Sequence, residues 1–355
     1  MLVPLPRCYF PPTTVQHVPT QYRCDDLFEV AQFGGKQAFA LVQKVPKPDA
    51  LVSVRIAATS LVRVSFRDDQ KLEWRFCGKR DTKRHELEDM EQLVLKLDSE
   101  TCGESTEVSE LVFAKTSTSS YCCTSNCTRK VIQFIRYICT LFNASVDYLQ
   151  ICPSKLHHLE EIQSDEMLKK GREVVVREGT VSHAEMRRIL GGFESDRMEI
   201  WCNPGPNFTY DRLISLQNFT VYAGSWFKGP MLLNLVNCEL VNLHGCRIAE
   251  EHLNIFLHEW FEKSTGCGTI LSLCIFPESE NYDCKDVYEP SGGQQEWDLE
   301  KITQGLSRFQ QPLPDPYWST SRVRRFCRTI DDTIIHVQKV GRAIDISGLR
   351  QRDLY

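Results

Sequence analysis

The sequence has no run of about 18 uninterrupted apolar residues, the length at which a membrane-spanning helix becomes possible. Residues 1–12 have no apolar stretch of about 7–15 residues, and prolines interrupt them, so we expect no secretory signal peptide. Neither sign of charge dominates, because 42 Lys and Arg stand against 47 Asp and Glu for a net charge of −5. Such a balance gives no general attraction to nucleic acid or to anionic membranes. We therefore expect an intracellular protein, cytoplasmic or nuclear, that binds neither.

Short catalytic motifs are also missing. The chain has no G-x-S-x-G nucleophile elbow, no G-x-x-x-x-G-K-[ST] phosphate loop and no H-E-x-x-H metal motif. The densest cysteine cluster, Cys122, Cys123 and Cys127, has no second pair at C-x₂-C spacing, and the nearest histidine pair is His157 and His158. The sequence thus predicts no catalytic residue, no cofactor and no metal. An enzyme whose catalytic groups come from distant parts of the chain is the open alternative.

Composition and rhythm change several times along the chain. Residues 1–25 are rich in Pro, Thr and Gln, which indicates a poorly ordered start. Alternation of apolar and polar residues, typical of half-buried strands, begins near residue 50. The predicted segments are a poorly ordered N-terminus at 1–25, a short helical segment at 26–48, a β-rich entry region at 49–109, β-α repeats at 110–276, and a loop with closing strands at 277–355.

Short strand-like runs recur in the middle of the chain at intervals of about 20–30 residues. Helix patterns lie between them, the clearest being residues 250–263 and a helix that follows a capping box of Ser182 and Glu185. This spacing predicts an α/β fold, a leucine-rich-repeat-like β-α solenoid with a small N-terminal helical segment and a C-terminal β cap. An ordinary open α/β sheet is the alternative. The expected strands are Val146–Ile151, Glu173–Arg177, Met198–Trp201, Phe219–Tyr222, Leu240–Leu243 and Ile270–Ile275, with Ser321–Cys327, Thr333–Val337 and Ala343–Ile346 closing the sheet.

One stretch carries a family resemblance. Residues 216–276 contain Leu235-Val236-Asn237-Cys238, a strand, and then the pattern E-x-x-L-N-x-F-L-x-x-W over 250–260. In these residues the chain resembles the nematode F-box-associated family of type 2. The resemblance extends over about 110–346 and is looser over 51–97.

The resemblance implies a role without catalysis. Proteins of this family usually begin with an F-box, a small helical module that docks on a Skp-type adaptor of a cullin-RING ubiquitin ligase. The associated region is then the part that binds the protein to be ubiquitylated. Residues 26–42 resemble the second half of that module, and the resemblance implies adaptor contacts at Leu27, Phe28, Phe39 and Leu41.

The residues before that segment depart from the family. Pro11, Pro12 and Pro19 stand where a helix of the module is expected, and proline costs about 3 kcal/mol inside a helix. The alternative function is therefore a solenoid-type protein–protein interaction module that has lost its link to the ligase. For the target, Trp226 and Phe227 lie in an apparent loop between repeats, so we expect them to be exposed and to contact the bound protein.

Overall fold

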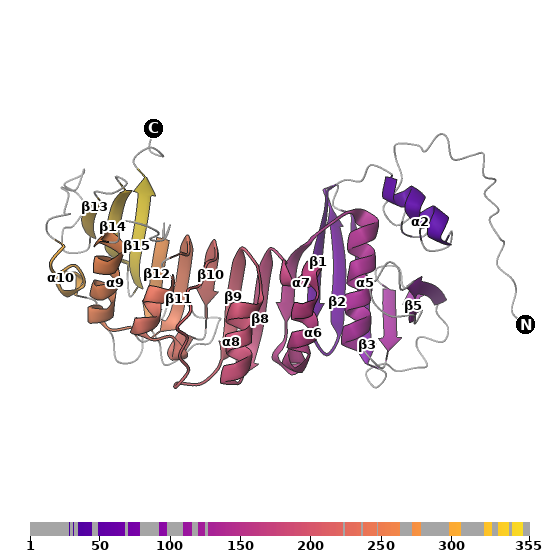
Figure 1. The fold of residues 1–355 in the computed structure, drawn as a ribbon, viewed down its shortest axis with the longest axis horizontal. Coiled ribbons are helices and arrows are strands. Elements are labelled where there is room, and N and C mark those ends of the chain that lie inside the picture. The colour runs from indigo at the N-terminus through magenta and orange to yellow at the C-terminus, as the bar shows by residue number, and fades with distance from the viewer. Residues whose placement is uncertain are drawn as a thin grey trace, which may run out of the picture. The chain divides into compact units, whose positions relative to one another are not determined.

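The structure is a computed structural model of the 355-residue chain, and its ribbon is drawn in Figure 1. Residues 1–25 and most of 26–34, which include Leu27, lie outside the described residues. The structure describes Phe28, Ala31 and residues 35–44, 49–67, 70–78, 92–97, 109–115, 120–124, 127–222, 224–235, 237–246, 248–262, 272–277, 298–306, 323–328, 333–340 and 343–350.

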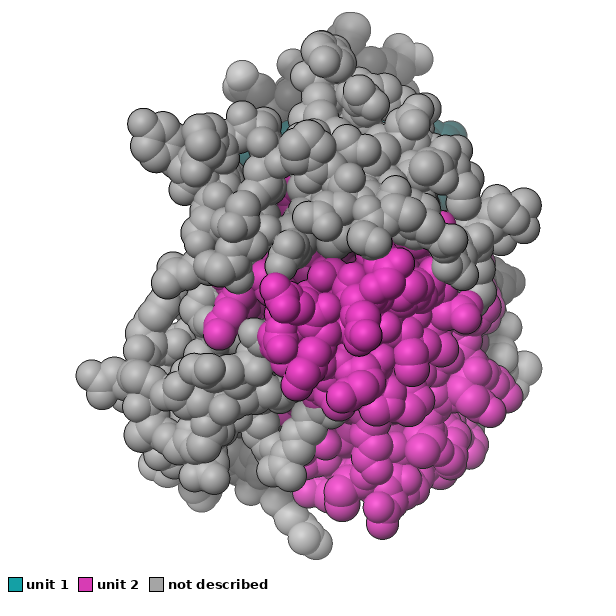
Figure 2. All heavy atoms as spheres, turned by 90° about the vertical axis from the view of Figure 1, so that its left-hand side faces the viewer, with its two compact units in different colours: residues 1–52, 62–145 teal, residues 53–61, 146–355 magenta. Residues whose placement is uncertain are grey.

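The chain divides into two compact units. Unit 1 comprises residues 1–52 and 62–145, and unit 2 comprises residues 53–61 and 146–355. Figure 2 shows the described surface of unit 2 in magenta. The division between residues 145 and 146 falls inside the segment 110–276 that was predicted to be one series of repeats.

Unit 1 combines a sheet with helices. Its strands follow one another in the order β2-β3-β6-β5-β4. Strand β6 pairs parallel with β3 and antiparallel with β5, and β5 pairs antiparallel with β4. The elements are α2 (Gly35–Lys44), β2 (Ser60–Phe66), β3 (Lys71–Gly78), β4 (Gln92–Leu97), β5 (Ser109–Lys115), β6 (Ser120–Thr124) and α5 (Cys127–Phe142).

Helix α5 supplies the core of unit 1. Its Phe134 is fully buried and lies 5.1 Å from Trp74, 5.3 Å from Phe76 and 5.4 Å from Phe113, measured between ring centroids. Trp74 and Phe76 are two residues apart on β3, so strand alternation directs both toward the helix. Aromatic pairs at these separations stabilise a core beyond the area they bury.

Unit 2 is built on a longer sheet. The order of its strands is β13-β14-β15-β12-β11-β10-β9-β8-β7, followed by β1 (Ala50–Ile56), which the division between the units splits after Val52. The other elements, which include the 3₁₀ helices η2–η4, are β7 (Val146–Ile151), η2 (Pro153–His158), α6 (Leu159–Ser164), α7 (Glu166–Lys169), β8 (Glu173–Thr180), α8 (His183–Gly192), β9 (Arg197–Asn203), β10 (Asn218–Val221), η3 (Gly224–Trp226), η4 (Gly229–Leu235), β11 (Leu240–Cys246), α9 (Glu250–Glu262), β12 (Ser272–Pro277), α10 (Leu299–Ile302), β13 (Val323–Arg328), β14 (Thr333–Val340) and β15 (Ala343–Arg350).

Strands β7 to β12 all pair parallel, whereas β12, β15, β14 and β13 pair antiparallel. The parallel register aligns one fully buried residue from each of five strands. These residues are Val176, Ile200, Val221, Leu243 and Ile275. Successive side chains of a strand point to opposite faces, so the residue that follows each of these five lies on the other face of the sheet.

The predicted leucine-rich-repeat-like solenoid is wrong. The fold is α/β with a large, mostly parallel mixed sheet and few helices, and its connections do not repeat. Strands β7 and β8 are joined by η2, α6 and α7, but residues 204–217 connect β9 to β10 without a helix, and η3 and η4 connect β10 to β11. The regular spacing of strands in the sequence therefore came from connections of similar length but different structure.

The local predictions at β7 and at the start of α8 are confirmed. The predicted strand at Val146–Ile151 has the bounds of β7. The predicted capping box forms at the start of α8: the Ser182 hydroxyl accepts from the Glu185 amide, and the Glu185 carboxylate accepts from the Ser182 amide. Among the described residues, no helix combines the length and apolar character needed to cross a membrane.

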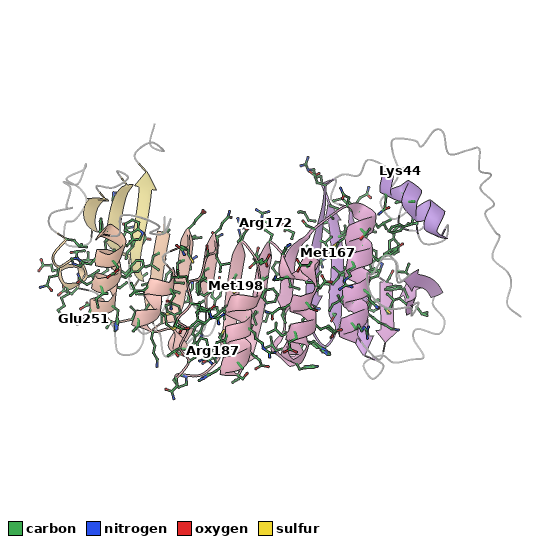
Figure 3. All side chains as sticks on the ribbon, in the orientation of Figure 1. Lys44, Met167, Arg172, Arg187, Met198 and Glu251 are labelled. Atoms are coloured by element: carbon green, nitrogen blue, oxygen red, sulfur yellow. The ribbon has the colours of Figure 1, made fainter. Side chains whose placement is uncertain are left out.

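The two faces of the unit 2 sheet differ. Figure 1 shows α6, α8 and α9 along one face of the strands. Met198 of β9 is buried on this side, whereas Arg187 lies on the exposed side of α8; both are labelled in Figure 3. Alternate residues of β9, Arg197, Glu199 and Trp201, are half-buried and lie on the opposite face. The candidate binding surface lies on that opposite face.

Candidate binding surface

Four ring side chains form a continuous stack across unit 2. Trp201 of β9 stacks on Tyr222, which directly follows β10, with ring centroids 3.7 Å apart and planes 18° apart. Tyr222 stacks on His244 of β11 at 4.9 Å and 11°. His244 stacks on Phe276 of β12 at 4.3 Å and 3°. We call these four residues the aromatic row.

The register of the sheet explains the aromatic row. Each of its residues follows a member of the buried row by one position, so all four side chains lie on one face at the same height. Neighbouring strands lie about 4.8 Å apart, close to the separation of stacked rings. Rings at equivalent positions of successive parallel strands therefore stack on one another.

Stacking determines which ring surfaces are available to a ligand. Each ring between the two ends of the row has both faces covered by its neighbours, so the row offers ring edges. Phe276 is 37% exposed, and Trp201, Tyr222 and His244 are half-buried. This arrangement excludes a flat ligand from sliding between the rings and suits apolar side chains that lie along the strip.

A charged network borders the Trp201 end of the row. The Arg177 guanidinium carbon lies 5.3 Å from the Trp201 ring centroid, a cation–π geometry. The Trp201 indole N–H donates to the Glu199 carboxylate at 3.2 Å. Burial raises the pKa of the Tyr148 hydroxyl, and the positive charge of Arg177 opposes that shift. Trp201 is thus held in place from two sides by charged groups.

The aromatic row itself carries no charge near neutral pH. Burial lowers the pKa of His244 below its ordinary value of 6.5, so its imidazole is neutral. Burial also raises the pKa of Tyr222, helped by the negative charge of Glu199 and opposed by Arg177. The strip is therefore an uncharged aromatic surface with polar ring atoms from indole, phenol and imidazole.

The thiols near these strands are not activated. Burial raises the pKa of Cys274 to about 11, that of Cys202 to about 12 and that of Cys238 to about 11. A nucleophilic cysteine needs a lowered pKa, so these three groups stay protonated at neutral pH. Among the described residues, no group of three or more His, Cys, Asp or Glu side chains could hold a metal ion.

The structure brings two of the predicted adaptor contacts together in unit 1. The ring centroids of Phe28 and Phe39 lie 6.4 and 5.1 Å from that of Tyr137 on α5. Phe28 is only 4% exposed and also contacts Trp74 at 4.9 Å, so it belongs to the core, whereas Phe39 is half-buried. Leu41 lies in α2, but its side chain, like all of Leu27, is outside the described residues.

The predicted exposure of Trp226 and Phe227 is wrong, because both are fully buried. After β10 the chain turns inward through η3, and Trp226 packs against Phe208 with ring centroids 5.4 Å apart. Gly224 permits this turn: a Cβ there would lie 2.3 Å from the Cys246 sulfur and 2.6 Å from the His244 carbonyl oxygen. A fully buried pair has no surface to offer a partner.

The aromatic row was missed from the sequence. None of its four residues is among the binding residues predicted from the sequence. The signal that could have found the row is positional: one ring side chain follows the apolar centre of each of four successive strands. Recognising it requires the strand register, which is not encoded in any one strand.

Comparison of the chain with models of protein families, with curated proteins and with solved structures gives no match. The resemblance to the F-box-associated family therefore stays a prediction.

Proposed function

We propose that this protein is a non-catalytic recognition subunit, which binds its target on the aromatic row and presents it to a cullin-RING ubiquitin ligase. The observation that carries the proposal is the stack of Trp201, Tyr222, His244 and Phe276 on the sheet face opposite the helices.

The chemistry of the row suits a protein interface. Aromatic residues are enriched at the centres of such interfaces, and charged residues are depleted there. Here an uncharged aromatic strip is bordered at one end by Arg177 and Glu199, which matches an apolar centre with a polar rim. A target segment with apolar side chains would bury the ring edges and leave the charged border in water.

The link to a ligase is supported by the sequence. Tyr222, His244 and Phe276 lie within residues 216–276, the stretch that resembles the F-box-associated family. The same resemblance assigns Phe39 to the adaptor-binding segment, and its half-buried ring leaves part of it available. The alternative is an interaction module without an adaptor. The prolines before residue 20 favour it, because they stand where a helix of the F-box is expected.

Reconstitution distinguishes the two. The full chain is co-expressed with a Skp-type adaptor and a cullin, and a stable complex is expected on size-exclusion chromatography. The variant Phe39→Ala is expected to weaken that complex, whereas Phe276→Ala in the aromatic row should leave it intact. A folded full chain that never binds the adaptor would refute the ligase role and leave the interaction module.

A separate experiment tests whether the aromatic row binds the target. Proteins that co-purify with the wild-type chain and are lost from Phe276→Ala should be ubiquitylated by the reconstituted ligase. A target that binds both chains equally would show that recognition lies elsewhere.

A further inference from the structure

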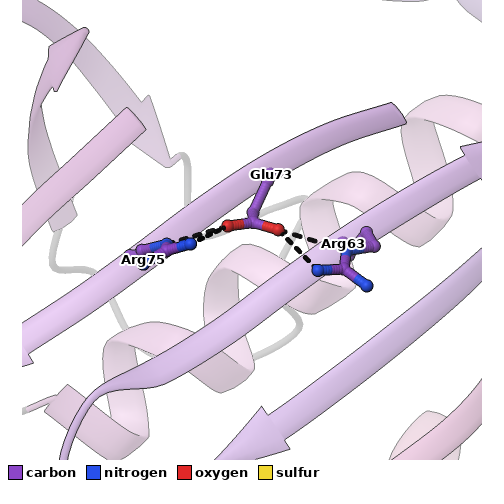
Figure 4. A network of polar contacts seen from close by, with 3 residues as sticks. All are labelled: Arg63, Glu73 and Arg75. Atoms are coloured by element: carbon purple, nitrogen blue, oxygen red, sulfur yellow. Dashed lines mark hydrogen bonds and ion pairs between the residues drawn. The ribbon is translucent and has the colours of Figure 1, made fainter. Parts of the chain in front are cut away.

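A second charged cluster lies in unit 1, on strands β2 and β3. The Glu73 carboxylate accepts from two arginines at once, as Figure 4 shows. Arg63 donates to one carboxylate oxygen through Nε at 3.2 Å and through Nη2 at 2.7 Å. Arg75 approaches the other oxygen through Nε at 2.8 Å and Nη2 at 2.7 Å. We call Arg63 and Arg75 the arginine pair; Glu73 is the carboxylate that they share.

Strand alternation places the cluster on the face opposite the core. Val62, Val64 and Trp74 are buried, so their neighbours Arg63, Glu73 and Arg75 lie on the other side of the strands. The Arg75 guanidinium carbon also lies 5.7 Å from the ring centroid of Tyr121 on β6. Arg75 is therefore oriented by a carboxylate and by an aromatic ring.

The cluster carries a net positive charge. Burial by itself would raise the pKa of Glu73, but hydrogen bonds from Arg63 and Arg75 outweigh it and lower that pKa, so the carboxylate is ionised at neutral pH. One negative charge then faces two positive ones. Lys71 is exposed and precedes Glu73 by two positions, so it adds a third cation to the same face.

Each arginine keeps donors that Glu73 does not use. The bonds to Glu73 occupy the Nε–Nη2 edge of both guanidiniums. Within the part of the chain that the structure describes, no partner is seen for either Nη1, and the side chains are 43% and 45% exposed. The free edge of a guanidinium matches a carboxylate in a bidentate geometry.

The position of Glu73 restricts the ligand. Because its carboxylate lies between the two arginines (Figure 4), a single small anion placed midway would meet the oxygens of Glu73 and be repelled. A ligand with two separated anionic groups avoids this, since each group can contact the outer edge of one arginine. Two carboxylates would also balance the net charge of Arg63, Lys71, Glu73 and Arg75.

We propose that the arginine pair binds an acidic peptide segment of a partner protein through two carboxylate side chains. Charge complementarity argues for this occupant: the patch is cationic although the whole chain has a net charge of −5. The same net charge disfavours a nucleic acid, whose binding relies on many phosphate contacts. The inference holds whether or not the protein belongs to a ligase.

A labelled peptide tests the proposal on the full chain. The probe is a fluorescein-labelled peptide in which glutamate alternates with serine, and its binding is followed by fluorescence anisotropy at low ionic strength. The double variant Arg63→Gln with Arg75→Gln is expected to lose at least about tenfold in affinity, or about 1.4 kcal/mol. The matched control is Arg188→Gln on α8, which removes an arginine that is 53% exposed and ion-paired with Glu160, and it should bind like the wild type.

Further variants separate a built site from diffuse attraction. Arg63→Lys with Arg75→Lys keeps both charges but removes the planar forks, and severalfold weaker binding is expected. Circular dichroism checks the folding of each variant. If the double glutamine variant does not fold, Arg75→Gln alone keeps the Arg63–Glu73 ion pair and is expected to bind severalfold more weakly.

Three results would overturn the proposal: unchanged binding by the folded glutamine variants, unchanged binding by the lysine variant, or tighter binding of a single-stranded RNA oligonucleotide that depends on the same arginines.

Discussion

The imidazole of His244 lies parallel to the ring of Phe276, with ring centroids 4.3 Å apart and planes only 3° apart. Tyr222 covers the other face of the imidazole at 4.9 Å. A histidine enclosed in this way is shielded from water on both sides, which is the physical reason that burial lowers its pKa.

This shielding predicts a pH dependence of stability. Because the pKa of His244 is lower in the folded state, its contribution to stability is fully present above the unfolded value, near 6.5, and is lost as the pH falls toward the folded value. We expect the melting temperature of the wild type to drop more between about pH 7.5 and pH 5.5 than that of His244→Phe, which cannot be protonated. Thermal melts followed by circular dichroism measure both. Equal drops in the two proteins would contradict the prediction.

Two tryptophans should respond differently to truncation. Trp226 is fully buried, so Trp226→Ala is expected to lower the free energy of unfolding by about 3–5 kcal/mol. Trp201 is half-buried and packs mainly on Tyr222 and Arg177, so Trp201→Ala should cost about 1–2 kcal/mol. Urea denaturation gives both values. A larger loss for Trp201→Ala would mean that the aromatic row is part of the core.

Local structure could be predicted from the sequence where a pattern is self-contained. The capping box of Ser182 and Glu185 depends on four consecutive residues, and the strand Val146–Ile151 on a short run in which Leu149 and Ile151, two positions apart, are both buried. Both are decided by short-range chemistry, and both form as predicted.

The architecture could not be predicted in the same way. Residues 204–217 and the segment with the 3₁₀ helices η3 and η4 are similar in length to a helical connection, so spacing alone suggested regular repeats. The candidate binding surface depends on pairing between strands, because Trp201 and Phe276 reach the same row only through the register of β9 to β12. Trp226 is buried because Gly224 lets the backbone pass close to His244, which no hydrophobic pattern reveals.

That close passage makes Gly224 sensitive to any side chain. A Cβ at this position would meet the sulfur of Cys246 at 2.3 Å and the backbone oxygen of His244 at 2.6 Å. Gly224→Ala is therefore expected to destabilise the protein by about 1–3 kcal/mol, as overpacking does. Chemical denaturation measures the change.

Gly191 provides the matched control. It lies in α8, and the nearest atom to an added Cβ is the Tyr210 hydroxyl at 3.4 Å, an ordinary contact. Alanine favours a helix over glycine by up to about 1 kcal/mol, so Gly191→Ala should be neutral or stabilising. Destabilisation by both variants to the same extent would refute the steric argument for Gly224.

The capping box at α8 should stabilise the protein in a way that depends on pH. Ser182→Ala removes the acceptor for the Glu185 amide and should cost about 1 kcal/mol, whereas Thr209→Ala in an exposed loop should cost nothing measurable. Hydrogen bonds from the Ser182 side chain and backbone lower the pKa of Glu185, so the stability that Glu185 provides is present above about 4.5 and is lost as the pH falls through its folded pKa. The difference between wild type and Ser182→Ala in urea midpoint should therefore shrink in acid. A difference that stays constant down to about pH 3 would show that the ionised Glu185 does not contribute to the cap.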